Sequence, residues 1–174
     1  MACSVYENYV DHYSEALKLA LMYHRDQKDK SGEPYIGHPI RVSKYIETRY
    51  GHTAYLERTV ALLHDIVEDT ECTLEILSMF FPENVVNAVD AITRRTGEKP
   101  EAYLRRVAQN FIASRVKLCD IKDNTDPVRL DMLSIRDQIH LRRKYRKSLS
   151  TLIHVSQNHL FRELAKEQLE EIPE

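Results

Sequence analysis

The segment ALLHDIVEDT, residues 61–70, is the part of the sequence that decides the fold. It lies in a stretch from about residue 54 to residue 68 whose apolar side chains would cover nearly every face of a helix. A helix that is hydrophobic all round is buried. We therefore expect a central buried helix over 54–68, and that helix carries four ionisable side chains within six residues: His64, Asp65, Glu68 and Asp69.

Helical periodicity also dominates the rest of the 174-residue chain, which has only 4 glycines. Apolar residues recur at three- and four-residue steps, the pattern of amphipathic helices. The segment RDQKDKSGEPYIG, residues 25–37, breaks this pattern and predicts a loop. The sequence thus predicts an all-α fold, an irregular bundle of about eight helices in one domain over 1–174. The helices expected besides 54–68 cover about 5–24, 39–50, 73–80, 83–95, 100–111, 112–124, 130–159 and 160–171.

Composition and charge exclude several classes of protein. The net charge of −2 offers no general attraction to nucleic acid or to an anionic membrane. The 3 cysteines are odd in number and none are spaced as C-x-x-C, which favours a reducing cytoplasm over a disulfide framework. No apolar run reaches the roughly 20 residues of a membrane-spanning helix. We expect a soluble cytoplasmic protein without a nucleic-acid or membrane partner, and we keep a homo-oligomer as an open alternative.

The ionisable residues of the buried segment need partners, because an uncompensated buried charge costs several kcal/mol. His38, at a loop-to-helix junction, and Asp120, in the apolar segment VKLCD, are further candidates. Two imidazoles and two carboxylates form a mixed nitrogen and oxygen ligand set for Mn²⁺, Fe²⁺, Co²⁺ or Zn²⁺. His64 or Asp120 alone would be more ordinary, as a core histidine or a helix cap. The four together favour a metal site of His38, His64, Asp65 and Asp120.

A metal with open positions suits hydrolysis of a phosphate ester, because it acidifies water and neutralises charge on phosphoryl oxygens. Glu68, one turn from His64, is our candidate for the proton acceptor, with Asp69 beside it. Phosphoryl transfer also requires cations around the site. The candidate cations are Lys30, Arg41, Arg94, Arg95, Lys117 and Lys122.

Three segments in combination resemble the hydrolase domain of RelA/SpoT-type proteins, a branch of the HD phosphohydrolases. They are GEPYIGHP at 32–39, ALLHDIVEDT at 61–70 and VKLCD at 116–120 followed by Asn124. The resemblance covers about residues 20–130, and a single domain of this size is similar to the small alarmone hydrolases. The tail over 131–174 carries no recognised motif.

The resemblance implies a role for each matching position. One Mn²⁺ would be held by His38, His64, Asp65 and Asp120. Glu68 and Asp69 would position and deprotonate the attacking water. Asn124 would contact the ribose of a small-molecule nucleotide and Lys30 would contact the substrate, with Arg41 and Lys117 as further candidate substrate-binding residues.

The implied reaction is removal of the 3′-pyrophosphate of guanosine tetraphosphate or pentaphosphate. Asp29 stands where the family has arginine, and a carboxylate there would disfavour a substrate with many phosphates. We therefore keep a second hypothesis, hydrolysis of another nucleotide such as an adenine alarmone, a phosphorylated dinucleotide or a nucleoside monophosphate. A non-catalytic nucleotide-binding module ranks lower. The basic run RRKYRK, residues 142–147, is interpreted as a solvated helix face rather than a nucleic-acid patch.

Overall fold

The computed structural model describes the backbone of residues 2–173 and the side chains of residues 11–173. This part of the chain is all-α, as predicted, and its only extended pairing is one isolated bridge between Lys28 and Pro34. The helices are α1 (Ala2–Tyr23), α2 (Gly37–Tyr50), α3 (Tyr55–Leu63), α4 (Ile66–Asp69), α5 (Leu74–Ser78), α6 (Glu83–Ile92), α7 (Pro100–Gln109), α8 (Phe111–Asn124), α9 (Pro127–Leu130), α10 (Ile135–Val155) and α11 (His159–Glu171).

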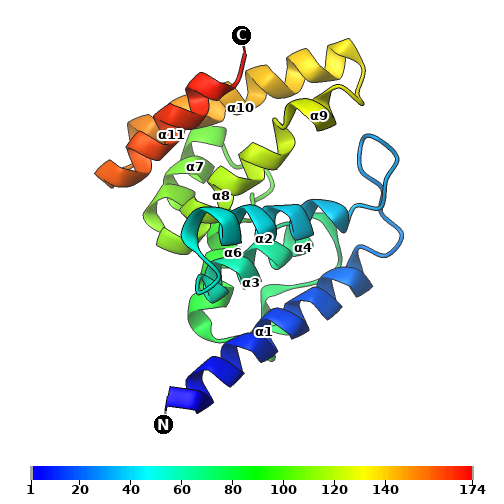
Figure 1. Ribbon diagram of the computed structural model, residues 1–174, viewed down its shortest axis with the longest axis vertical. Helices are drawn as coiled ribbons and strands as arrows, with labels where there is room; N and C mark the ends of the chain where they lie inside the picture. The colour runs from blue at the N-terminus through cyan, green and yellow to red at the C-terminus, as the bar shows by residue number, and fades with distance from the viewer. Residues whose placement is uncertain (1, 174) are drawn as a thin grey trace.

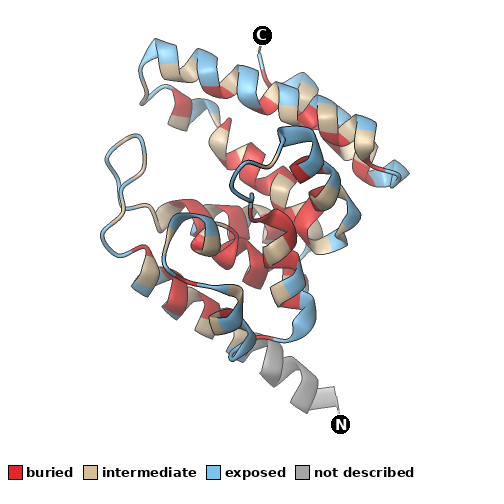
Figure 2. Cartoon of the chain, turned by 180° about the vertical axis from the view of Figure 1, so that it is seen from behind, coloured by how far each residue is buried: buried red, intermediate tan, exposed pale blue. Residues whose placement is uncertain are grey.

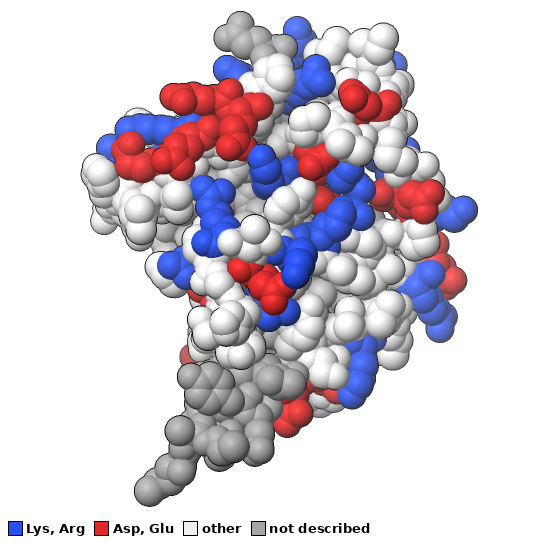
Figure 3. Space-filling model, in the orientation of Figure 1, with Lys and Arg blue, Asp and Glu red and all other residues white. Residues whose placement is uncertain are grey.

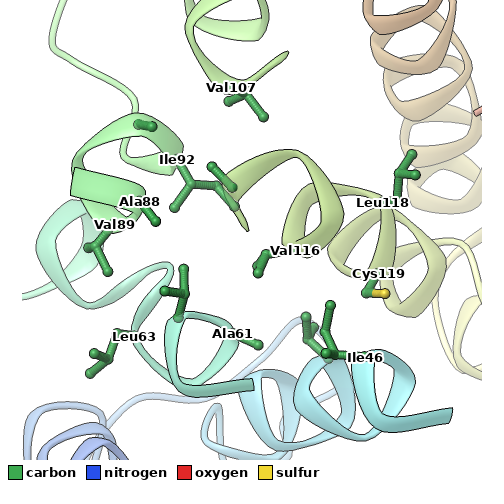
Figure 4. Packing of buried hydrophobic residues seen from close by; sticks show 14 of the residues in the cluster. Ile46, Ala61, Leu63, Ala88, Val89, Ile92, Val107, Val116, Leu118 and Cys119 are labelled. Atoms are coloured by element: carbon green, nitrogen blue, oxygen red, sulfur yellow. The ribbon is translucent and has the colours of Figure 1, made fainter. Parts of the chain in front are cut away.

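Two helices, α3 and α8, lie at the centre of the bundle. Helix α3 packs against α1, α2 and α6, while α8 packs against α2, α3, α6, α7 and α11. Both are coloured mainly as buried in Figure 2, and the close view of Figure 4 shows Ala61 of α3 near Val116 of α8. The expectation of a buried helix before residue 64 is confirmed, and α8 is a second one.

The remaining helices surround this centre (Figure 1). Helix α1 lies along one end of the molecule against α3, while α10 and α11 lie side by side at the other end and cover α7 and α8. The predicted loop between α1 and α2 projects beyond the bundle. Within the described residues, none of the helices is long and apolar enough to cross a bilayer.

The prediction of a single helix over 54–68 is wrong in one respect, because the helix is interrupted at His64 and Asp65, two of the candidate metal ligands. Helix α3 ends at Leu63 and α4 begins at Ile66, with Asp65 at φ −105° and ψ −5° between them. The φ of Asp65 departs from the α-helical value of about −63°, so the backbone here is not that of a continuous helix. Neighbouring residues on a continuous helix would point about 100° apart, and here both side chains reach one place.

Other boundaries follow local signals, some of which sequence analysis identified. The Thr73 side chain caps α5, Gly51 ends α2 at φ 89° and Pro100 opens α7. The helix predicted over 130–159 is shorter, because Asp126 caps the separate turn α9 and Ser134 caps α10.

Truncation of Leu62, which is fully buried in α3, will lower the free energy of unfolding. Leu62→Ala removes apolar contacts and leaves a cavity, for which we expect a loss of about 2–5 kcal/mol. Urea unfolding followed by circular dichroism measures it. Met79→Ala is the control, since Met79 is 71% exposed and its loss should cost less than about 0.5 kcal/mol.

Candidate metal centre and its cleft

Four of the predicted site residues meet where α2, the break after α3 and α8 come together. One ligand atom from each of His38, His64 and Asp65 lies within 4.8 Å of the others. Asp120 Oδ1 lies 3.3 Å from His38 Nε2 and 3.8 Å from His64 Nε2. Residues up to 82 positions apart are thus gathered around one point.

Both imidazoles present the same nitrogen to this point. His38 Nδ1 lies 2.8 Å from Asp123 Oδ2, and His64 Nδ1 lies 2.8 Å from the carbonyl oxygen of Ala61. Because a carbonyl only accepts, His64 Nδ1 carries a hydrogen, which leaves the Nε2 lone pair directed at the cluster. His64 Nε2 is buried and makes no hydrogen bond. An orphaned buried nitrogen beside two carboxylates fits a bound divalent cation.

Asp123 is a functional residue that sequence analysis missed. Its carboxylate is fully buried, binds His38, and accepts two hydrogen bonds from the Arg41 guanidinium, at 2.7 and 3.1 Å. Arg129 Nε lies 3.4 Å from the same carboxylate. A carboxylate behind a ligating histidine fixes its tautomer and orientation. The available signal was the spacing, since Asp123 follows Asp120 by three positions on the same helix face.

Tyr35 is the second residue that sequence reasoning did not single out, although it lies in the GEPYIGHP motif. Its hydroxyl donates a hydrogen bond to Asp65 Oδ2. Burial, followed by the nearby charge of Asp65, raises the pKa of Tyr35, so it stays a proton donor. Tyr35 therefore holds the carboxylate of a candidate ligand in place.

The charges of the cluster compensate one another. Burial would raise the pKa of Asp120, but the Lys117 ammonium at 2.7 Å and the two histidines hold that pKa well below its usual range. Burial would lower the pKa of His38, yet its hydrogen bonds to Asp120 and Asp123 raise the pKa to about 10. The metal-free cluster therefore consists of ionised carboxylates and protonated imidazole.

Glu68 and Asp69, the predicted catalytic pair, occupy α4 at the edge of this cluster. Glu68 Oε2 accepts a hydrogen bond of 2.9 Å from the backbone N–H of Arg94. Burial and the negative charges of Asp65 and Glu68 raise the pKa of Asp69. Both residues line the same cleft as His64, and a carboxyl with a raised pKa is a better proton acceptor.

The cleft has a volume of about 860 Å³, within the range of nucleotide-sized ligand pockets. Its walls come from the loop between α1 and α2, from α4, from the start of α7, from α8 and from α10. The cluster of His38, His64, Asp65 and Asp120, called the metal cluster below, opens into this cleft. Among the predicted cations, the cleft is lined by Lys30, Arg94 and Lys117.

The predicted substrate-binding residues are distributed unevenly around this cleft. Lys117 and Asn124 line it, but both also bind Asp120, at 2.7 Å from Lys117 Nζ and 2.5 Å from Asn124 Nδ2. Arg41 is not part of the lining, because its guanidinium is held by Asp123 behind His38. We therefore correct the interpretation of Arg41 from substrate contact to support of His38. Lys122 and Arg95 pair instead with Glu171 and Asp90.

Asp29 does not present a bare negative charge to the cleft. One carboxylate oxygen accepts hydrogen bonds from the backbone and hydroxyl of Ser31 and from the backbone of Glu33, and the other lies 3.2 Å from the Arg129 guanidinium. Burial would raise the pKa of Asp29, but these donors lower it. The local charge reversal expected from the sequence is thus offset by Arg129.

Comparison with known proteins finds relatives that are named as pyrophosphohydrolases. A guanosine-3′,5′-bis(diphosphate) 3′-pyrophosphohydrolase of Aquifex aeolicus is 33% identical over 132 residues, which are 72% of this chain and 18% of that protein. The human guanosine-3′,5′-bis(diphosphate) 3′-pyrophosphohydrolase MESH1 is 41% identical over 81 residues, 45% of each chain. The chain thus spans less than half the length of these curated relatives.

The fold is that of a known structural class. A solved structure of a metazoan ortholog of SpoT, described as hydrolyzing ppGpp, superposes with a TM-score of 0.74 at 23% identity, over 92% of this chain and 94% of that one. An all-α bundle with a His and Asp cluster between its central helices defines the class of protein. The model of the HD domain family matches residues 16–165, and the chain belongs to that family.

Removal of the carboxylate behind His38 will weaken metal binding. Asp123→Asn keeps the size of the side chain but weakens its bond to His38 Nδ1 and its pairing with Arg41. We expect the affinity for Mn²⁺, measured by isothermal titration calorimetry, to fall about 10- to 100-fold. Asp131→Asn, at an exposed position outside the site, is the control. Equal affinities in both variants would contradict the role of Asp123.

Metal affinity will also rise with pH. Since the pKa of His38 is raised to about 10, this imidazole is protonated at neutral pH and must lose a proton before Nε2 can bind a cation. The apparent Mn²⁺ affinity should increase about tenfold per pH unit between pH 6.5 and 8 for each proton released. Calorimetry in buffers of different ionisation enthalpy counts these protons. A pH-independent affinity would mean that His38 is neutral in the metal-free protein.

Proposed function

We propose that this protein is a metal-dependent phosphohydrolase that removes the 3′-pyrophosphate of guanosine tetraphosphate or pentaphosphate. The observation that carries the proposal is the cluster of His38, His64, Asp65 and Asp120 at the base of a cleft lined by cations. The HD family membership and the named activity of the relatives support the same reaction.

The metal would be held by His38 Nε2, His64 Nε2 and the carboxylates of Asp65 and Asp120. When bound, a divalent ion such as Mn²⁺ supplies positive charge to phosphoryl oxygens and acidifies water. The ligand set suits Mn²⁺, and Fe²⁺, Co²⁺ or Zn²⁺ fit the same atoms.

The residues of the chain itself perform the proton transfer. Water attacks the phosphorus bonded to the ribose 3′ oxygen, and the bond between that phosphorus and the 3′ oxygen breaks. The 3′ oxygen takes up a proton to become a hydroxyl, which balances the proton lost by the water, and pyrophosphate is released. The raised pKa of Asp69 favours this residue over Glu68, our candidate from the sequence, as the acceptor of the water proton. One carboxylate oxygen of Glu68 orients the water, while its Oε2 accepts a hydrogen bond from the backbone N–H of Arg94. Lys30 and Asn124 would contact the nucleotide.

We further propose that residues 1–174 act as one HD unit in the cytoplasm. One buried apolar cluster extends from Ala16 to Ile172. Cys72 and Cys119 are both buried thiols without a disulfide, which supports a reducing compartment.

A second candidate is hydrolysis of another nucleotide, such as an adenine alarmone, a phosphorylated dinucleotide or a nucleoside monophosphate. Asp29 favours keeping it, because the loop carries a carboxylate where the relatives of this branch carry a cation. The pairing of Asp29 with Arg129 weakens that objection to the guanosine substrate.

Product analysis tests the proposal. Guanosine tetraphosphate incubated with the protein and Mn²⁺ should yield pyrophosphate and GDP, and a His64→Ala, Asp65→Ala variant should yield neither. Asp69→Asn, which removes the proton acceptor, should lower kcat about 10²- to 10⁴-fold, whereas Glu71→Gln, at an exposed position nearby, should not. Release of orthophosphate, or turnover of adenine nucleotides alone, would favour the second candidate. Binding without turnover of any nucleotide would indicate a non-catalytic module.

A further inference from the structure

Helix α10 contributes one wall of the cleft through Lys144, Lys147, Ser148 and Thr151. These residues stand at positions i, i+3, i+4 and i+7, so they form one stripe along the helix. The sequence interpretation of residues 142–147 as a solvated helix face holds for Lys144 and Lys147, which are exposed, and the structure adds that both line the cleft. Arg142 and Arg143 are not among the lining residues.

The lysines of this wall lack counter-charges. Within the described residues, no Asp or Glu oxygen lies within 4.0 Å of the ammonium groups of Lys30, Lys144 or Lys147. Lysines elsewhere behave differently, since Lys44 and Lys166 pair with glutamates at 2.6 and 2.8 Å. The acidic side chains of the neighbouring helix α11 gather on the surface seen in Figure 3. The unpaired cations around the cleft indicate that its natural counter-charge is an anionic ligand.

Lys144 is close enough to the metal cluster to interact with it electrostatically. Burial within the cleft lowers its pKa, and so do the like charges of Lys117 and Lys30, while Asp120 and Glu68 oppose this shift. The ammonium groups of Lys30 and Lys144 line the same cleft and repel each other. A multiply charged anion between them relieves that repulsion.

The stripe on α10 and the metal cluster lie on different elements of the same cleft. The metal cluster is built by α2, α8 and the break between α3 and α4, and none of its ligands comes from α10. A cleft of about 860 Å³ accommodates a whole nucleotide. A ligand that spans both places must therefore carry phosphate groups at two separate positions.

We propose that Lys144 and Lys147 form a second phosphate-binding site for the non-reacting phosphates of a nucleotide. This inference rests on the proposed function, in which the reacting 3′-pyrophosphate lies at the candidate metal centre. The second site then binds the 5′-diphosphate. It selects nucleotides that are phosphorylated at both the 3′ and 5′ positions, and it gives the C-terminal region a role in binding.

The test measures binding of GDP, which carries only the 5′-diphosphate, by calorimetry, with guanosine as the probe that lacks phosphate. The Kd for GDP should rise about tenfold or more in the double variant Lys144→Gln, Lys147→Gln, because two charge-assisted contacts are lost. The affinity for guanosine should stay the same. The dependence of the GDP Kd on salt should also become weaker.

Arg143→Gln is the matched control, since it removes a cation from the same helix outside the cleft lining and should leave the GDP Kd within twofold. Thermal unfolding and the Mn²⁺ affinity, both expected to be unchanged, show that the double variant is folded with an intact metal cluster. During turnover of guanosine tetraphosphate, KM should rise about tenfold while kcat stays within about threefold.

The outcomes separate the two proposals. Weakened GDP binding in a protein that hydrolyses no guanosine tetraphosphate would overturn the proposed function and leave the second site standing. A GDP affinity that differs less than twofold between the double variant and Arg143→Gln would overturn the second site, whether or not hydrolysis occurs. The absence of measurable GDP binding to the unaltered protein would overturn it as well.

Discussion

The buried carboxylate of Asp123 is the constraint on which the site depends. It joins His38 of α2 to Arg41 of the same helix and approaches Arg129 of α9. A fully buried carboxylate is unfavourable unless its charge is paired and its oxygens are hydrogen-bonded. Because His38 and Arg41 satisfy that requirement together, α2 can pack on α8 only in the register that directs His38 Nε2 at the metal cluster.

The same need for a counter-charge links Asp123 to the loop between α1 and α2. Arg129 lies between Asp123 and Asp29, and Asp29 in turn organises the turn that contains Lys30 by accepting hydrogen bonds from Ser31 and Glu33. The negative charge of Asp29, which would disfavour a phosphate ligand, is instead bound by donors of the loop and by Arg129. The metal cluster and the loop are therefore linked by one continuous set of ion pairs.

Inside the metal cluster each charged side chain has a partner of opposite charge or a hydrogen-bond donor, whereas several cations that line the surrounding cleft have no counter-charge. Lys117 neutralises Asp120, and Tyr35 holds Asp65. Lys30, Lys144 and Lys147, which line the cleft, have no such partners among the described residues. This contrast separates residues that build the site from residues that are available to a ligand, and it is consistent with a substrate that carries several negative charges.

From the sequence alone, the all-α class, the loop over 25–37 and the group of His38, His64, Asp65 and Asp120 were predictable. Apolar periodicity reports which helix faces are buried, and ionisable residues in apolar segments stand out because burial is costly. Three features required the tertiary structure: the helix break at His64, the pairing of Asp29 with Arg129, and the division of residues 142–147 between cleft and solvent. Each depends on which distant side chain supplies the compensating charge or the facing wall. Spacing along one chain does not contain that information, because packing of α8, α9 and α10 brings those groups together.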